Sequence, residues 1–121
     1  MATVLIVDDS PTEVHVLKTM LEKNNYSVIS ATSGEQGVAL AKERKPDLVL
    51  MDIVMPGLNG FQATLQLTTN PETAHIPVVI VTTKNQETDR VWGMRQGAKD
   101  YLTKPVSEQE LIGKVRTVLG G

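Results

Sequence analysis

The sequence predicts an α/β fold in which five strands alternate with five helices in a doubly wound parallel sheet. Three short and almost continuous apolar runs, at residues 4–7, 48–51 and 78–81, are typical of strands that are buried on both faces. Segments of helical length lie between these runs, and parallel strands need such crossovers. The alternation therefore predicts a central sheet that is covered by helices on both sides.

Helix starts are marked by a capping residue that is followed three positions later by Glu or Gln, the pattern of the capping box. The four pairs are Ser10 with Glu13, Ser33 with Gln36, Asn59 with Gln62, and Ser107 with Glu110. Pro11 follows the first cap, at the position where helices favour proline. Apolar residues at helical spacing, such as Val14, Leu17 and Leu21, support the helical assignment of these segments.

The strand order follows from which strands are apolar throughout. Residues 26–31 and 100–103 mix polar with apolar side chains and are expected to form edge strands. In the flavodoxin-like order 2-1-3-4-5 the first, third and fourth strands are interior, whereas the Rossmann order would place the third at an edge. The flavodoxin-like order is therefore predicted. Its topological switch point lies between the first and third strands, and ligands bind there, beyond the carboxyl ends of the strands.

Composition limits the class of protein. A length of 121 residues with 40% hydrophobic side chains suits one domain, expected to span residues 1–121 without an effector domain. A net charge of −2 and four aromatic residues argue against nucleic-acid binding. The absence of cysteine removes disulfides and thiolate zinc sites, and it fits a cytoplasmic protein. No apolar run approaches the ~20 residues of a membrane helix, so no membrane contact is expected.

Three aspartates directly follow predicted interior strands. Asp8 and Asp9 follow the first strand and Asp52 follows the third, so the strand order brings their carboxylates together at the switch point. A single aspartate after a strand more often caps a helix, but Ser10 and Asn59 already occupy the cap positions here. The mutual repulsion of the three carboxylates requires a cation or shifted pKa values. Oxygen ligands in a loose, hydrated cluster favour Mg²⁺.

The fourth and fifth strands contribute complementary groups. Thr82 offers a hydroxyl donor and Lys104 offers a cation, although each alone is a weak signal, since turn threonines and solvated lysines are common. Together with the acids and Mg²⁺ they form a site for a transferring phosphoryl group. Asp52 is the candidate nucleophile, because it stands alone while Asp8 and Asp9 are paired to hold the metal.

These motifs resemble the receiver domain of two-component response regulators over essentially the whole chain. The matching segments are Asp8-Asp9, residues 51–57 with Asn59-Gly60 following, Thr82, and residues 100–105. The resemblance implies a signalling module and not an enzyme. It implies that Asp52 accepts a phosphoryl group from a phosphohistidine of a sensor histidine kinase, and that the domain assists its own phosphorylation and dephosphorylation.

The resemblance also implies roles for the surrounding residues. Asp9, Asp52 and the backbone carbonyl of Val54 would bind Mg²⁺, with Asp8 assisting through water. Thr82 would donate a hydrogen bond to the phosphoryl group and Lys104 would pair with it, and the Lys104-Pro105 peptide bond would be cis. Tyr101 resembles the switch aromatic that turns inward when the threonine moves. The alternative for Tyr101 is an aromatic without a switch role on a half-exposed edge strand.

Two positions depart from the flagellar chemotaxis regulator. Val54 stands two residues after the acceptor, where that regulator has Asn, and Lys84 stands two residues after Thr82, where it has Glu. Neither side chain can orient an attacking water, so a longer-lived phosphoryl group is expected. Four segments instead resemble stand-alone receivers of the chemosensory systems that govern type IV pili and twitching motility: residues 8–13, 58–64, 86–89 and 91–93.

Without an effector domain, the signal must leave through a surface. The predicted fourth helix carries Arg90, Trp92, Met94 and Arg95, and we expect it to form the face for a downstream protein target or a sister regulator. Trp92 could instead pack on its own sheet. The two histidines, His15 and His75, lie in no metal-spacing motif and are expected at the surface.

Other functions stay open from the sequence. A phosphate sink that drains phosphoryl groups from a sister regulator, or a receiver of another chemosensory system, would have the same motifs. A small phosphatase or phosphotransferase with an aspartyl intermediate wants two acids two residues apart after one strand, whereas Asp8 and Asp9 are adjacent. A flavin carrier would need a phosphate-cradling loop after the first strand, where these aspartates would repel the phosphate.

Overall fold

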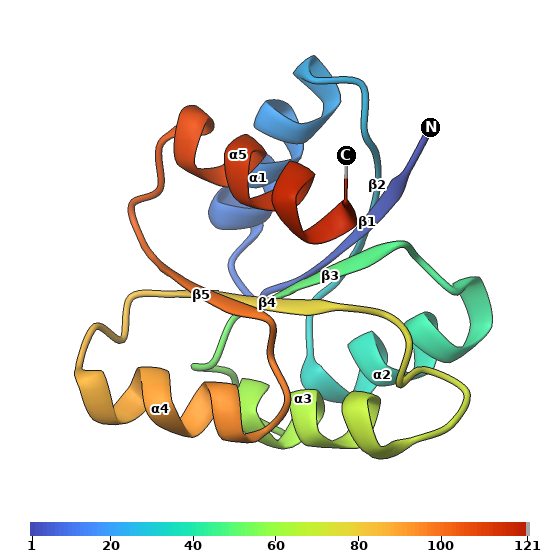
Figure 1. Ribbon diagram of the computed structural model, residues 1–121, viewed down its shortest axis with the longest axis vertical. Helices are drawn as coiled ribbons and strands as arrows, with labels where there is room; N and C mark the ends of the chain where they lie inside the picture. Colours follow the sequence, from blue (N-terminus) through green and yellow to red (C-terminus); the bar gives the residue numbers. More distant parts are fainter. Residues whose placement is uncertain (121) are drawn as a thin grey trace.

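The computed structural model describes residues 1–120, and at its centre lies a parallel sheet with the strand order β2-β1-β3-β4-β5 (Figure 1). The predicted strand order is confirmed. The strands are β1 (Thr3–Val7), β2 (Ser27–Ala31), β3 (Leu48–Met51), β4 (Val78–Thr82) and β5 (Asp100–Thr103). Val7 pairs with Met51 in the register of β1 and β3, so the residues that follow these two strands emerge side by side.

Four of the five helices begin where the capping residues predict. The helices are α1 (Pro11–Lys23), α2 (Gly34–Arg44), α3 (Gly60–Thr69), α4 (Glu87–Arg95) and α5 (Glu108–Leu119). The cap side chains that accept a hydrogen bond from the backbone N–H three residues later are those of Ser10, Ser33, Asn59 and Ser107. The reciprocal contact that completes a capping box is present at α3 and α5. The N-cap of α4, Gln86, makes no such side-chain bond.

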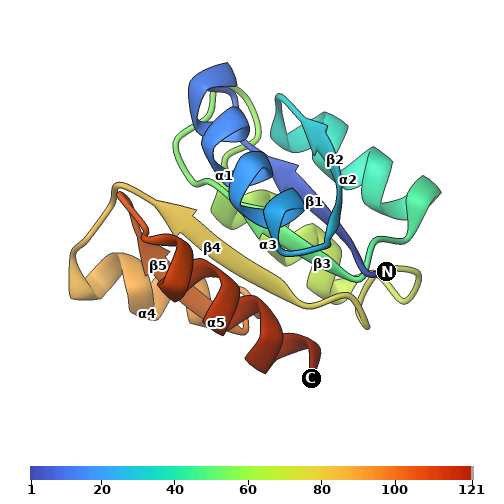
Figure 2. The same ribbon diagram turned by 90° about the horizontal axis from the view of Figure 1, so that it is seen from above.

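The sheet is covered on both faces, with α1 and α5 on one side and α2, α3 and α4 on the other (Figures 1 and 2). Successive residues of a strand point to opposite faces. On β1, Val4 and Ile6 belong to the apolar cluster that includes residues of α1 and α5, whereas Leu5 and Val7 belong to the cluster that includes residues of α2 and α3. Both layers therefore need apolar residues, which explains the unbroken apolar runs of the interior strands.

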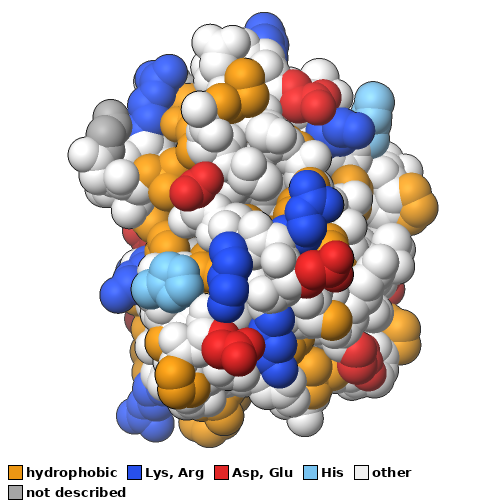
Figure 3. All heavy atoms as spheres, turned by 90° about the vertical axis from the view of Figure 1, so that its right-hand side faces the viewer, with side chains coloured by type: hydrophobic (Ala, Val, Ile, Leu, Met, Phe, Trp, Pro, Cys, Tyr) orange, Lys and Arg blue, Asp and Glu red, His pale blue; other side chains and the backbone are white. Residues whose placement is uncertain are grey.

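The outer surface carries mixed charge. On the side where the strands begin, acidic and basic side chains are interspersed and neither sign dominates (Figure 3). His15 and His75 are exposed, as expected. Within residues 1–120, no helix combines the length and the apolar character needed to cross a membrane.

Candidate functional site

The three aspartates meet at the carboxyl ends of β1 and β3. Asp8 and Asp9 follow β1 and Asp52 follows β3, and one carboxylate oxygen of each lies within 4.8 Å of the others. Asp8 and Asp52 are buried, with Asp52 only 9% exposed, while Asp9 is exposed. The predicted cluster is therefore present, and two of its members lie largely out of contact with water.

Lys104 enters this cluster from the loop after β5. Its Nζ lies 2.7 Å from Asp8 Oδ2, 3.7 Å from Asp52 Oδ2 and 3.7 Å from Glu13 Oε2. The lysine side chain is 8% exposed, so these carboxylates replace much of its hydration. The Lys104-Pro105 peptide bond is cis, as the sequence resemblance implies.

One oxygen of each buried aspartate is held by the backbone. The N–H of Ser10 donates to Asp8 Oδ1 at 2.9 Å, and the N–H of Ile53 donates to Asp52 Oδ1 at 2.8 Å. Asp8 therefore does contribute to the start of α1, a local role that the cap position of Ser10 had not indicated. The Oδ2 atoms of both aspartates face Lys104 and are directed into the cluster.

The environment favours the neutral form of Asp52. Burial is the largest effect and raises the pKa of Asp52, and the negative charge of Asp8 acts in the same direction. Lys104, the Ile53 N–H and the Thr82 hydroxyl oppose the rise without cancelling it. Burial works to lower the pKa of Lys104, but the hydrogen bond to Asp8 and the charges of Asp52, Asp8 and Glu13 outweigh it and raise that pKa.

The donor set fits Mg²⁺. The cluster offers carboxylate oxygens and no sulfur or imidazole, which is the chemistry that a hard divalent cation prefers. Lys104 supplies one positive charge beside the three carboxylates of Asp8, Asp9 and Asp52, so negative charge remains uncompensated. A second, divalent positive charge would therefore relieve the repulsion among Asp8, Asp9 and Asp52.

Thr82 and Tyr101 are linked through Lys84. Thr82, fully buried at the end of β4, accepts a hydrogen bond from the Lys84 N–H at 3.4 Å. The Tyr101 hydroxyl donates to the Lys84 carbonyl at 2.7 Å. Tyr101 lies on the edge strand β5, where its side chain is buried and packs with Ile80 beneath α4. The edge-strand position is therefore confirmed, and the switch role of Tyr101 stays a prediction. The aromatic faces inward in this structure.

We expect replacement of Tyr101 by Phe to change stability in a pH-dependent way. Burial, with the charges of Asp89 and Asp52, raises the pKa of Tyr101 from 10.0 to about 12. The folded protein favours the neutral tyrosine more strongly than the unfolded chain does. The contribution of neutral Tyr101 to the free energy of unfolding is therefore complete below pH 10 and is lost as the pH rises through about 12. Tyr101→Phe also leaves the Lys84 carbonyl without its partner, at a cost of about 1 kcal/mol near neutral pH.

Urea unfolding at neutral pH and spectroscopic titration of the tyrosines test this expectation. The titration step near pH 12 is absent in Tyr101→Phe and present in Tyr26→Phe. An unchanged titration curve in Tyr101→Phe would contradict the assignment.

The remaining predicted residues lie in the loops after β3 and β4 and on α4. Val54 is 56% exposed in the β3–α3 loop, and Lys84 is exposed after β4. Arg90 and Arg95 are exposed on α4, while Met94 is partly buried against the cluster that contains Ile80 and Tyr101.

Trp92 lies on the outer surface of α4. Its side chain is 50% exposed and lines a shallow surface hollow with Glu87, Thr88, Val91 and Arg95. The alternative that Trp92 packs on its own sheet is therefore wrong.

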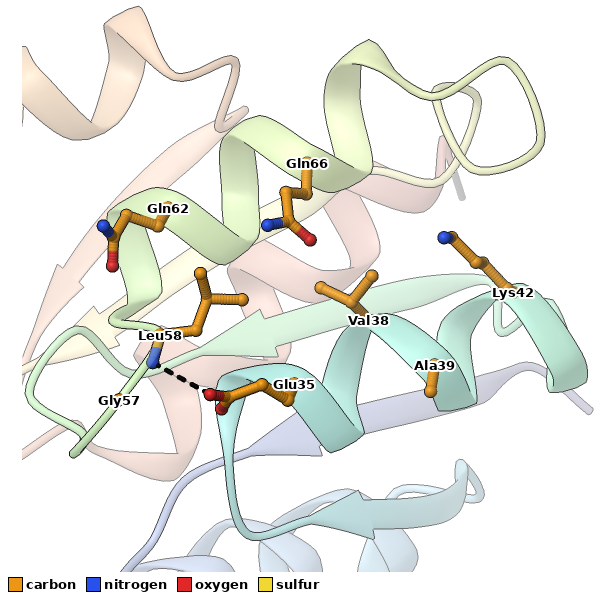
Figure 4. A pocket seen from close by; sticks show the side chains of 8 residues that line it. All are labelled: Glu35, Val38, Ala39, Lys42, Gly57, Leu58, Gln62 and Gln66. Carbon is orange, nitrogen blue, oxygen red and sulfur yellow. Dashed lines mark hydrogen bonds between the residues drawn. The ribbon is translucent and has the colours of Figure 1, made fainter.

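Two other hollows differ in their relation to the aspartates. A hollow of about 540 Å³ lies between α2 and α3, where Glu35 accepts a hydrogen bond from the Leu58 N–H at 3.2 Å (Figure 4). None of the three aspartates lines it. A second hollow, of about 320 Å³, is lined by Glu13, Thr83, Lys104 and Pro105, among others, and adjoins the cluster. Glu13 is a site residue that sequence reasoning assigned only to helix capping.

The fold and this site define a class of protein. The response regulator receiver domain family matches residues 4–116, and the chain belongs to that family. Receiver domains are signalling modules of two-component systems that histidine kinases phosphorylate, and they bind Mg²⁺ at an acidic cluster of this kind.

Among individual proteins, the chain is similar to Protein PilH of Pseudomonas aeruginosa, with 65% identity over 121 residues and the full length of both chains. It is 38% identical to Response regulator PleD of Caulobacter vibrioides over 97% of this chain but 26% of that protein. The chain thus spans about a quarter of PleD. Among solved structures, chemotaxis protein CheY4 of Vibrio cholerae superposes with a TM-score of 0.91 at 27% identity, over 98% of each chain.

Proposed function

We propose that this chain acts as a single-domain response regulator that carries its phosphoryl group on Asp52. The observation that carries the proposal is the placement of Asp52 within 4.8 Å of two further carboxylates and 3.7 Å from the buried Lys104 ammonium. A carboxylate in that position can attack phosphorus, and the cations around it can stabilise the charge that develops. Thr82, Lys104, Asp8 and Asp9 serve this one reaction.

The transfer takes a phosphoryl group from a phosphohistidine of a sensor histidine kinase. An oxygen of Asp52 forms a bond to phosphorus while the bond from phosphorus to the histidine nitrogen breaks, and that nitrogen recovers its electron pair and then a proton. Asp8, Asp9, Asp52 and the Val54 carbonyl would hold Mg²⁺, which supplies positive charge to the phosphoryl oxygens when bound. Lys104 pairs with the same oxygens, and the Thr82 hydroxyl donates to one of them.

Phosphorylation then changes the charge at Asp52 from −1 to roughly −2. Lys104 and Thr82 are drawn toward the new charge, and the movement of Thr82 reaches Tyr101 through the Lys84 backbone. Tyr101 packs beneath α4, so α4 receives the change. We place the face for a downstream protein target or a sister regulator on α4, at Arg90, Met94 and Arg95.

The biological setting is inferred from similarity. The likeness to Protein PilH over the full length of both chains supports a role in a chemosensory system for type IV pili and twitching motility, as the sequence resemblance implies. We propose a cytoplasmic location, because the proposed phosphodonor is a sensor histidine kinase.

Incubation with a small-molecule phosphodonor and Mg²⁺ tests the proposal. We expect intact-mass spectrometry to show one added phosphoryl group that requires Mg²⁺ and disappears in Asp52→Asn. Uptake that persists in Asp52→Asn would refute the assignment of Asp52. Steady turnover of unrelated phosphomonoesters would favour the phosphatase alternative instead.

We expect the phosphoryl group to be lost faster when Val54 and Lys84 are replaced by the residues of the flagellar regulator. Val54→Asn together with Lys84→Glu introduces side chains that can orient a water beside Asp52. A general base of this kind contributes about 10²-fold or more, so even partial positioning gives a rate increase of about tenfold. Loss of phosphoryl label from purified protein measures it, with Lys84→Gln as the control for removal of the charge. Equal rates of phosphoryl loss in the wild type and the double variant would contradict the expectation that Val54 and Lys84 prolong the lifetime of the phosphoryl group.

A further inference from the structure

Glu13 does not do what its place in the sequence predicts. It stands three residues after the cap Ser10, where a capping-box carboxylate would accept from the Ser10 N–H. That N–H instead donates to Asp8 Oδ1 at 2.9 Å. The Glu13 carboxylate points to the site, with Oε2 at 3.7 Å from Lys104 Nζ. Its charge is therefore available to act on Lys104.

Lys104 is shared among three carboxylates in unequal surroundings. Asp8 makes the short contact at 2.7 Å, while Asp52 and Glu13 lie at the same distance of 3.7 Å. The Asp52 side chain is 10% exposed and that of Glu13 is 40% exposed. Glu13 and Asp52 thus compete for the same ammonium, and Glu13 is the one that water can solvate when it loses the contact.

We propose that Glu13 is a positioning residue that restrains Lys104 in the unphosphorylated protein and weakens the hold of the domain on its phosphoryl group. The inference rests on the function proposed above. A phosphoryl group on Asp52 takes Lys104 from Glu13, and the cost of breaking that ion pair is subtracted from the affinity for the phosphoryl group. The hollow of about 320 Å³ beside Lys104 gives the released carboxylate room to turn into water.

The variant Glu13→Gln isolates this effect. The Ser10 cap accepts from the backbone N–H of residue 13, which glutamine retains, so the start of α1 is preserved while the charge is removed. Glu22→Gln is the matched control, because it removes a carboxylate from the exposed surface of the same helix, where the structure gives it no ion pair. Equal thermal unfolding of the two variants would show that the fold is undisturbed.

Calorimetric binding of beryllofluoride, a phosphoryl mimic, in the presence of Mg²⁺ gives the readout. We expect Glu13→Gln to bind about two- to fivefold more tightly than wild type, which is the range for a partly exposed ion pair, and Glu22→Gln to bind as wild type does. In a Lys104→Met background the effect of Glu13→Gln should vanish, because Glu13 acts through Lys104. An effect of equal size in that background would show direct repulsion of the ligand and overturn the proposal.

The outcomes separate the two levels of inference. Binding in wild type that is lost in Asp52→Asn, with no difference between wild type and Glu13→Gln, refutes the role of Glu13 alone. Absence of binding in wild type, or equal binding in Asp52→Asn, refutes the proposed function and the role of Glu13 with it.

Discussion

Asp52→Asn is expected to unfold at a higher temperature than the wild type although it takes up no phosphoryl group. Burial and the neighbouring Asp8 raise the pKa of Asp52, so its ionised form is less favourable in the folded chain than in the unfolded one. Asparagine keeps the shape and removes the charge, and Lys104 retains its 2.7 Å contact with Asp8. The expected gain is of the order of 1 kcal/mol, or a few degrees in Tm for a domain of this size.

The pH dependence of that gain identifies its cause. Because the folded pKa of Asp52 lies above the ordinary 3.8, the wild type loses stability relative to the variant as the pH rises from 3.8 through the raised value. The difference is then constant toward neutral pH and absent below 3.8. Unfolding scans across this window measure it, with the exposed Glu43→Gln on α2 as the control for net charge.

Mg²⁺ should reverse the order of the two Tm values, so that the wild type becomes the more stable protein. The ion relieves the repulsion in wild type, so it raises the Tm of the wild type more than that of Asp52→Asn. A variant that is less stable than wild type at neutral pH without Mg²⁺ would show that Asp52 stabilises the fold through Lys104, contrary to this expectation.

Gly60→Ala is expected to destabilise the protein by about 3 kcal/mol, which lowers the Tm by roughly 10 °C. A Cβ at Gly60 would clash with the Asp52 carbonyl oxygen and would lie 2.7 Å from the Ile53 Cα. Both neighbours are backbone atoms, and the Gly60 N–H donates to the Ile53 carbonyl at 3.0 Å in the same contact. The start of α3 must therefore move away from the end of β3, and it disturbs the position of Asp52 as it moves.

Gly113→Ala is the matched control for this substitution. Gly113 lies within α5, and a Cβ there would meet nothing within 4 Å. The helix then gains about 0.5–1 kcal/mol, since alanine loses less backbone freedom than glycine on folding. Urea unfolding of both variants measures the two opposite shifts. A Gly60→Ala variant as stable as wild type would show that the β3–α3 loop yields without cost.

Local sequence signals were sufficient for the elements and their order. Ser10, Ser33, Asn59 and Ser107 cap the four helices that they predicted, because a cap satisfies backbone groups only a few residues away. The start of α4 at Gln86 lacks such a cap, and the helix packs through Met94 against Ile80 and Tyr101. The apolar runs predicted the interior strands because both faces of those strands are covered.

The place of each site residue in the sheet also followed from sequence, because the carboxyl ends of parallel strands share one edge. That rule brings Asp8, Asp9, Asp52, Thr82 and Lys104 together whatever their side chains do. The orientations of the site side chains, in contrast, were decided by the tertiary structure alone. The inward position of Tyr101 depends on the Lys84 carbonyl, and the contact of Glu13 with Lys104 joins residues that are distant in the chain. Such contacts are set by packing between elements, which no local pattern encodes.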